Sequence, residues 1–126
     1  EMTIEYANPS VAEADIASID SVRFLSSGKA NHRSLPSIVA ISFAAPISGL
    51  SETLSYDAHR TNFETINGTA RTTTDGSSAW TYSNLEDLEM LCTKIATIEV
   101  YLSYLALEVT YTEVAADNAI FFGTNF

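Results

Sequence analysis

Hydrophobic and polar residues alternate with a period of two along much of this chain, a pattern that predicts β-strands with one buried face. In Ile16–Leu25, Val22 and Phe24 share one parity, and polar residues occupy much of the other. In Ile38–Ala45 the large residues share one face and small residues the other, which predicts a strand covered on both sides. The remaining shorter strands are expected at Met2–Tyr6, Leu50–Tyr56, Thr61–Ile66, Thr69–Thr74 and Met90–Ile95.

The longest apolar run, Ile98–Thr112, departs from simple alternation. Val100 and Leu102 lie on one parity, whereas Leu105 and Leu107 lie on the other. Such a strand is either central and covered on both faces, or it contains a β-bulge that moves its core face to the other parity. We interpret it as the central strand of the fold, with the bulge as the alternative.

Turn and cap signals separate the expected strands. Asn67-Gly68 is the strongest hairpin signal, because both central positions of a type I′ turn need a positive φ. Asp75-Gly76 is a second turn signal. After Trp80, the S-x-x-E spacing of Ser83 and Glu86 predicts a capping box and one or two turns of helix. One face of that helix would carry Leu85, Leu88 and Leu91.

Short strands separated by turn residues about every 8–12 positions predict an all-β fold, an antiparallel β-sandwich with one short helix after Trp80. A length of 126 residues fits one domain. We expect residues 1–15 to be an N-terminal arm or edge strand and residues 16–112 to be the sandwich. Residues 113–126 would be a tail that docks on the domain or on a neighbouring subunit, and Ser26–Ser37 a polar loop.

The chain has a net charge of −10, from six Lys and Arg against sixteen Asp and Glu. This charge limits the classes of partner that the protein can bind. A phosphate backbone and an anionic membrane would both be repelled, so we expect neither nucleic acid nor membrane as a partner. Cys92 is the only cysteine, so no disulfide forms within the chain, and its apolar neighbours predict burial. This cysteine usage fits assembly in a reducing cytoplasm. The first residue is Glu1 rather than Met, which is compatible with a segment upstream of it.

Candidate catalytic and metal-binding groups are sparse. His32 and His59 both have arginine neighbours in polar, loop-like segments, where a surface position is expected. Asp57 and His59 could supply two metal ligands, whereas zinc sites use three or four. Asp75 could join Asp57 or Asp87 in a calcium site, although turn chemistry also explains it. We therefore expect no enzyme activity, catalytic residue, cofactor or metal site.

The two ends of the chain are the candidate interaction segments. The C-terminal Glu113–Phe126 is an acidic spacer followed by aromatic residues, which would be a liability at a terminus unless they dock. The interface residues expected from both ends are Ile4, Tyr6, Ile120, Phe121, Phe122 and Phe126. Trp80 is expected to be a structural anchor, packed where the turn meets the helix.

Three stretches, IDSVRF, TTTDGSSAWTYSNLEDLEM and IEVYLSYLALEVTYT, together resemble jelly-roll-like β-sandwich modules of tailed-phage and prophage virion structural proteins. In those modules a turn of the type T-D-P-x-T-G-x-x-W-T leads into a short helix, and a late strand ends in V-x-V-x-Y-L-E-V-x-Y. The resemblance covers about Ile16–Thr112. The proline after the aspartate is absent, and Cys92 stands where a glycine often follows the helix.

What this resemblance implies is a non-enzymatic virion component, such as a capsid decoration, head-fibre or tail accessory protein. Such a protein is made in the host cytoplasm, is exposed on the particle, and binds other virion proteins and itself, with a trimer as one candidate. The alternative is a carbohydrate- or receptor-binding sandwich that stacks a glycan on exposed aromatic rings. The candidates for that stacking are Tyr56, Trp80 and Tyr82.

Overall fold

In a computed structural model, the described part of the chain forms seven strands and two short helices. The structure describes residues 2–5, 11–45, 47, 50–57, 62–86, 88–95 and 97–115. In chain order the elements are β1 (Met2–Glu5), the 3₁₀ helix η1 (Glu13–Asp15), β2 (Ile16–Ala30), β3 (Ser37–Ala45), β4 (Ser51–Tyr56), β5 (Glu64–Asn67), α1 (Tyr82–Leu85), β6 (Glu89–Lys94) and β7 (Val100–Glu113).

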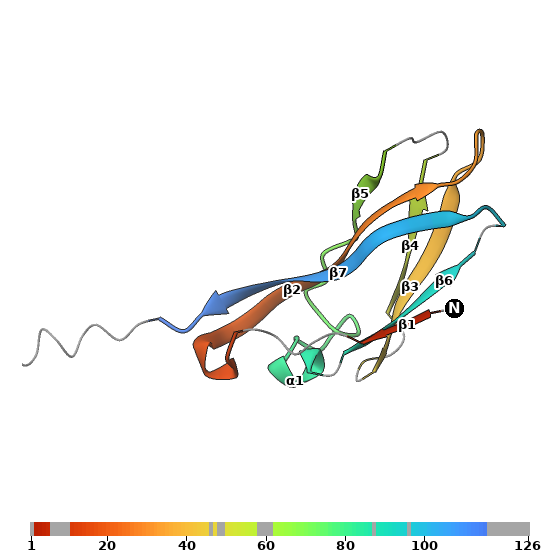
Figure 1. Ribbon diagram of the computed structural model, residues 1–126. Coiled ribbons are helices and arrows are strands. Elements are labelled where there is room, and N and C mark those ends of the chain that lie inside the picture. Colours follow the sequence, from red (N-terminus) through yellow and green to blue (C-terminus); the bar gives the residue numbers. More distant parts are fainter. Residues whose placement is uncertain are drawn as a thin grey trace, which may run out of the picture.

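The strands form two antiparallel sheets that face each other across the core. One sheet has four strands in the order β1-β6-β3-β4, and the other has three in the order β5-β2-β7 (Figure 1). Several neighbours are distant in the sequence, so the chain crosses repeatedly between the sheets, as in Greek-key sandwiches. The expected all-β, sandwich-like fold is therefore confirmed, and so is a single short α-helix after Trp80 among the described residues.

Strand β2 is the central strand of the three-stranded sheet, paired with β5 on one side and β7 on the other. Val22 and Phe24 point into the core, as their shared parity predicts. The expected loop from Ser26 to Ser37 is wrong in its first part, because β2 continues to Ala30. Ser26 is fully buried and accepts a 2.7 Å hydrogen bond from the Tyr56 hydroxyl, which satisfies its polar atom inside the sandwich.

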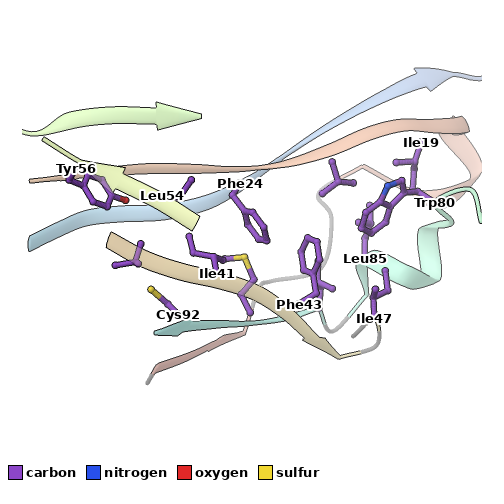
Figure 2. Close-up of a cluster of buried hydrophobic side chains, with 14 of the residues drawn as sticks. Ile19, Phe24, Ile41, Phe43, Ile47, Leu54, Tyr56, Trp80, Leu85 and Cys92 are labelled. Carbon is purple, nitrogen blue, oxygen red and sulfur yellow. The ribbon is translucent and has the colours of Figure 1, made fainter. Parts of the chain in front are cut away.

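The core fills the space between the sheets (Figure 2). The Phe24 ring from β2 lies 4.8 Å from the Phe43 ring of β3, between centroids. Phe43 in turn meets Trp80 edge-on at 5.8 Å. Aromatic pairs of this kind add about 0.5–1.5 kcal/mol beyond the area that they bury. The two ring contacts link β2, β3 and the segment before α1 within the larger apolar core.

The turn before Trp80 forms as the sequence predicts. Gly76 has a φ of 90°, and Asp75 Oδ1 accepts backbone hydrogen bonds from Ser77 at 2.9 Å and Ser78 at 2.7 Å. Trp80 itself is only 4% exposed, and its indole N–H donates to the Arg71 carbonyl at 2.9 Å. The burial expected for Trp80 is thus observed, and its one polar atom has a partner.

The hairpin expected at Asn67-Gly68 is wrong. The chain does not reverse there but continues beside β2: the Gly68 N–H donates to the Phe24 carbonyl, and Arg71 pairs with Val22. A Cβ at Gly68 would come within 2.5 Å of a Glu52 carboxylate oxygen, so the Glu52 side chain would have to shift to admit a larger residue. Pairing with β2 therefore overrides the local preference for a type I′ turn.

The capping box expected at Ser83 and Glu86 is also wrong, because the helix starts two residues earlier. Thr81 is the N-cap, and its backbone N–H donates to the Asn84 side chain at 2.8 Å. The helix ends at Leu85, so Leu85, Leu88 and Leu91 do not share a helical face. Leu85 and Leu88 are nevertheless both buried in the core.

Candidate functional site

Strand β7 is one of the two outer strands of the three-stranded sheet, and no strand of the described chain pairs with its other side. The interpretation of Ile98–Thr112 as the central strand is therefore wrong, since β2 holds that place. The alternative is confirmed: Ser27 pairs with Tyr104 and the next residue, Gly28, pairs with Leu102, so Ser103 is an extra residue in β7. A long strand edge left open in this way offers unpaired backbone donors and acceptors to another chain.

The bulge lets both halves of β7 face the core. Val100 and Leu102 point inward before Ser103, and Leu105 and Leu107 point inward after it. All four side chains remain only partly buried, although they pack on the core. Their partners on the adjacent β2, by contrast, include fully buried residues. The apolar row of β7 is thus half covered, because nothing described lies beyond it.

The two sheets differ by one strand, and the difference falls at β7. Strand β4 contacts both β5 and β2 across the sandwich. Together with the Phe24–Phe43 ring contact between β2 and β3, this contact leaves β1, at the far edge of the wider sheet, without a counterpart in the three-stranded sheet of the described chain. A further strand beside β7 would lie opposite β1 and would cover the half-buried row.

The open edge contains an uncharged segment of eight residues, Val100–Leu107, which we call the edge octet. Glu99 precedes it and Glu108 follows it. Glu108 is bonded to Arg23 at 2.7 Å, with side chains 43% and 32% exposed. An ion pair this accessible to water contributes less than about 1 kcal/mol. The edge is therefore apolar in its middle and acidic at its ends.

The outer face of the same sheet carries exposed aromatic rings. Tyr101 and Tyr104, both on β7, are 47% and 45% exposed, and Phe63, before β5, is 47% exposed. The Lys29 ammonium lies 5.0 Å from the centre of the Phe63 ring, within cation–π range. The Asn31 amide donates to the Tyr101 hydroxyl at 3.1 Å and so orients that ring. An apolar and aromatic surface thus continues from the edge of β7 onto the outer face.

Most of the interface residues expected at the two termini lie outside the described residues. These are Tyr6, Ile120, Phe121, Phe122 and Phe126, and the side chain of Ile4. The backbone of Ile4 belongs to β1, where it pairs with Met90 at the edge of the four-stranded sheet.

His32 and Asp75, two of the groups considered for catalysis or metal binding, have structural partners. Nδ1 of His32 accepts the backbone N–H groups of Ser34 and Leu35, which closes the loop after β2. Hydrogen bonds from the backbone N–H groups of Ser78 and Ser77 lower the pKa of Asp75 to about 2. No group of three or more His, Cys, Asp or Glu side chains that could hold a metal occurs among the described residues, which leave out His59 and Asp87.

Two buried side chains have raised pKa values because burial disfavours their charged forms. Removal from water raises the pKa of Tyr56 above its usual 10.0, and burial likewise raises that of Cys92 above 9.0. A thiol held protonated in this way is a poor nucleophile. Cys92 therefore acts as a small core residue, and its burial agrees with the sequence.

The three rings considered for stacking a glycan do not form a platform. Tyr56 is fully buried and Trp80 nearly so. Tyr82 is partly buried, and its hydroxyl donates to the Val11 carbonyl at 3.0 Å. The exposed rings are instead those of Tyr101, Tyr104 and Phe63, which the sequence pattern did not single out. Tyr101 and Tyr104 lie on opposite parities in the sequence, and the bulge at Ser103 allows both rings to be exposed.

Comparison with models of protein families, with curated proteins and with solved structures gives no match for this chain. None of the helices in the described part of the chain is long and apolar enough to cross a membrane.

Proposed function

We propose that this protein is a non-enzymatic assembly module that works by binding other protein chains, including copies of itself, through the open edge of β7. The observation that carries the proposal is the edge octet, which is apolar, unpaired by any described strand and only half buried. An edge of this kind is normally blunted by charges, prolines or a covering element. The octet has no charge and no proline.

The setting that we propose is a virion, as a capsid decoration, head-fibre or tail accessory protein exposed on the particle. This part rests on the resemblance of the Trp80 turn and the final strand to tailed-phage structural modules. A rigid sandwich with an adhesive edge suits such a role, because it can join a lattice without changing its own fold. The net charge of −10 suits it as well, since it keeps unassembled copies soluble.

The mass of the purified protein in solution tests the assembly role. Light scattering over a range of concentrations should give a mass above that of one 13.7 kDa chain, with a trimer as one expected state. When the protein is expressed together with the proteins of a candidate particle, the purified particle should carry it in a fixed ratio to the particle's own subunits. A protein that stays monomeric at high concentration and joins no particle contradicts the proposal.

A second candidate function is binding of a glycan, and the outer face of the three-stranded sheet favours it. Tyr101, Tyr104 and Phe63 expose rings on which a sugar could stack, and the Asn31 amide and Glu99 carboxylate lie beside Tyr101. Binding on a glycan array that is lost in Tyr101→Ala, with the fold retained, would support it. Tyr82→Ala is the matched control, because that ring is tied to Val11.

A further inference from the structure

The open edge of β7 has a specific occupant in this chain's own sequence. We propose that residues Ala119–Phe126 of a neighbouring copy add to the edge octet as an eighth strand and complete the three-stranded sheet. The inference rests on the proposed assembly role and names the contact that performs it. Addition of an extended segment to a sheet edge is a general mode of recognition, in which backbone hydrogen bonds supply affinity and side-chain contacts supply selectivity.

Charge matching is the first reason for this choice. The chain carries sixteen acidic residues, so many pairings of segments from two copies would bring carboxylates together. Ala119–Phe126 has eight residues and no charged side chain, like the edge octet. The two segments can therefore pair along their full length without placing like charges opposite each other, which destabilises cross-strand pairs.

The same reasoning disfavours a symmetric pair of β7 strands. If the octet paired with the octet of a second copy in antiparallel register, Glu99 would lie opposite Glu108 at both ends of the contact. Like charges directly opposite each other weaken such a pair. Only one of these two carboxylates, that of Glu108, has an arginine partner among the described residues. The uncharged tail avoids this conflict.

The tail of the same chain cannot pair with the octet along its full length, because Ala119 cannot reach Leu107. The Val114 N–H donates to the Asp15 carbonyl at 3.0 Å, so the chain follows β2 to that point. Leu107 lies seven residues earlier, about 23 Å back along the strand. From Val114 to Ala119 the chain spans at most about 18 Å, even with no residues used to reverse direction. A tail from another copy has no such limit.

The geometry of the sandwich gives the added strand a place. Beside β7 it would lie opposite β1 and over the half-buried side chains of Val100, Leu102, Leu105 and Leu107. Side chains on its other face would meet the exposed Tyr101 and Tyr104 rings. Phe121 and Phe122 are consecutive, so one ring would point to each face of an extended strand. Aromatic residues would thus cover both sides of the edge.

Donation of the tail from one copy to the next also determines the symmetry of the oligomer. Each copy has one donor tail and one acceptor edge, so two copies can exchange tails reciprocally, or several can close a ring head to tail. A trimer is one such ring. The assembly would be stable only when every edge is filled, because an end with an open edge would leave the octet exposed.

Cysteine trapping between two different chains tests the contact, in a Cys92→Ala background that removes the native thiol. One chain carries Ala106→Cys in the octet, and the other carries Cys in place of Ile120, Phe122 or Thr124 in turn. Mixed under mild oxidation, they should form a disulfide-linked heterodimer. The matched control is Thr110→Cys, which is also on β7 but outside the octet. We expect its yield to be at least about tenfold lower, the ratio that corresponds to about 1.4 kcal/mol.

The outcomes separate this inference from the proposed function. Loss of the oligomer on removal of residues 119–126, with the circular dichroism of a folded β protein retained, supports the tail as donor. If the truncated chain still forms the oligomer and no tail cysteine is trapped at Ala106, the inference is overturned while the assembly role stands. A cross-link found only within single chains that carry both cysteines overturns it too. If the intact protein never associates, the assembly role itself fails.

Discussion

Strands β2 and β7 lie side by side over most of their length, yet their apolar side chains differ in how deeply they are buried. Phe24 of β2 and Leu107 of β7 are direct cross-strand partners that point to the same side of the sheet. Phe24 is 1% exposed, whereas Leu107 remains partly exposed. The difference does not come from hydrophobicity, because both side chains are large and apolar. It comes from position: β2 has a neighbour on each side, and β7 has one among the described strands.

The comparison shows that a strand can have the composition of a central strand and the place of an edge strand. In a chain that folds and works as a monomer, such an edge is usually protected by charge or by cover. Here the octet carries neither in the described chain. We interpret its composition as that of a strand which becomes central after association.

Deleting one residue from β7 should produce the largest effect and should reveal the role of the bulge. Loss of Ala106 shifts the strand beyond it by one position and turns Leu107 and Val109 away from the core, so we expect destabilisation of more than about 4 kcal/mol. Loss of Ser103 removes the bulge and restores regular alternation, so we expect a cost below about 2 kcal/mol. Urea denaturation measures both. Equal losses in the two variants would contradict the assigned register.

Truncation of the cross-strand pair should give the next largest difference. Phe24→Ala leaves a cavity in the core and should cost about 3–5 kcal/mol. Leu107→Ala should cost about 1–2 kcal/mol in dilute, monomeric protein, because less apolar area leaves water there on folding. At concentrations that favour association, the cost of Leu107→Ala should rise. A cost for Leu107→Ala that is independent of concentration would argue against a covered edge.

Removal of the buried hydroxyl that joins β4 to β2 should have a moderate effect with a defined pH dependence. Tyr56→Phe deletes the bond to Ser26 and should cost about 1–2 kcal/mol at neutral pH. The folded pKa of Tyr56 is raised, so its contribution is complete below pH 10.0 and is lost as the pH rises through the folded value. The midpoint temperature of thermal unfolding should therefore fall less steeply between pH 8 and about 11 in Tyr56→Phe than in the native protein. Parallel curves would contradict this.

A change in the turn before Trp80 should have the smallest effect and serves as a reference that touches neither strand. The folded pKa of Asp75 is lowered from 3.8 to about 2. Its contribution is therefore present above pH 3.8 and is lost as the pH falls from there through about 2. Asp75→Asn should unfold with a shallower acid dependence than the native protein, and its association through β7 should be unchanged. A change in oligomeric mass would show that the turn influences the edge.

Much of the fold could be predicted from local patterns. The parity of Val22 and Phe24 marks the buried face of β2, and the Asp75-Gly76 turn forms where its chemistry requires. The bulge in β7 could be predicted as one of two explanations for a parity that changes midway. These features depend on neighbours in sequence, which is why a sequence alone carries them.

Features that depend on neighbours in space could not be predicted in the same way. Asn67-Gly68 looks like a hairpin until β2 is placed beside it, and Ser26 looks like a loop residue until Tyr56 supplies a donor. Whether Ile98–Thr112 is central or at an edge is a property of the sheet order and leaves no trace in the strand's own alternation. The candidate site was missed for that reason.

Hydrogen exchange along β7 tests the central claim most directly. In an edge strand, alternate backbone N–H groups point away from the sheet and exchange with solvent, whereas in a central strand nearly all are protected. At concentrations where the protein associates, we predict slow exchange at consecutive amides of the edge octet. Fast exchange at alternate positions should return on dilution or on removal of residues 119–126. Alternate fast amides in the fully associated protein would contradict the claim that another chain completes this sheet.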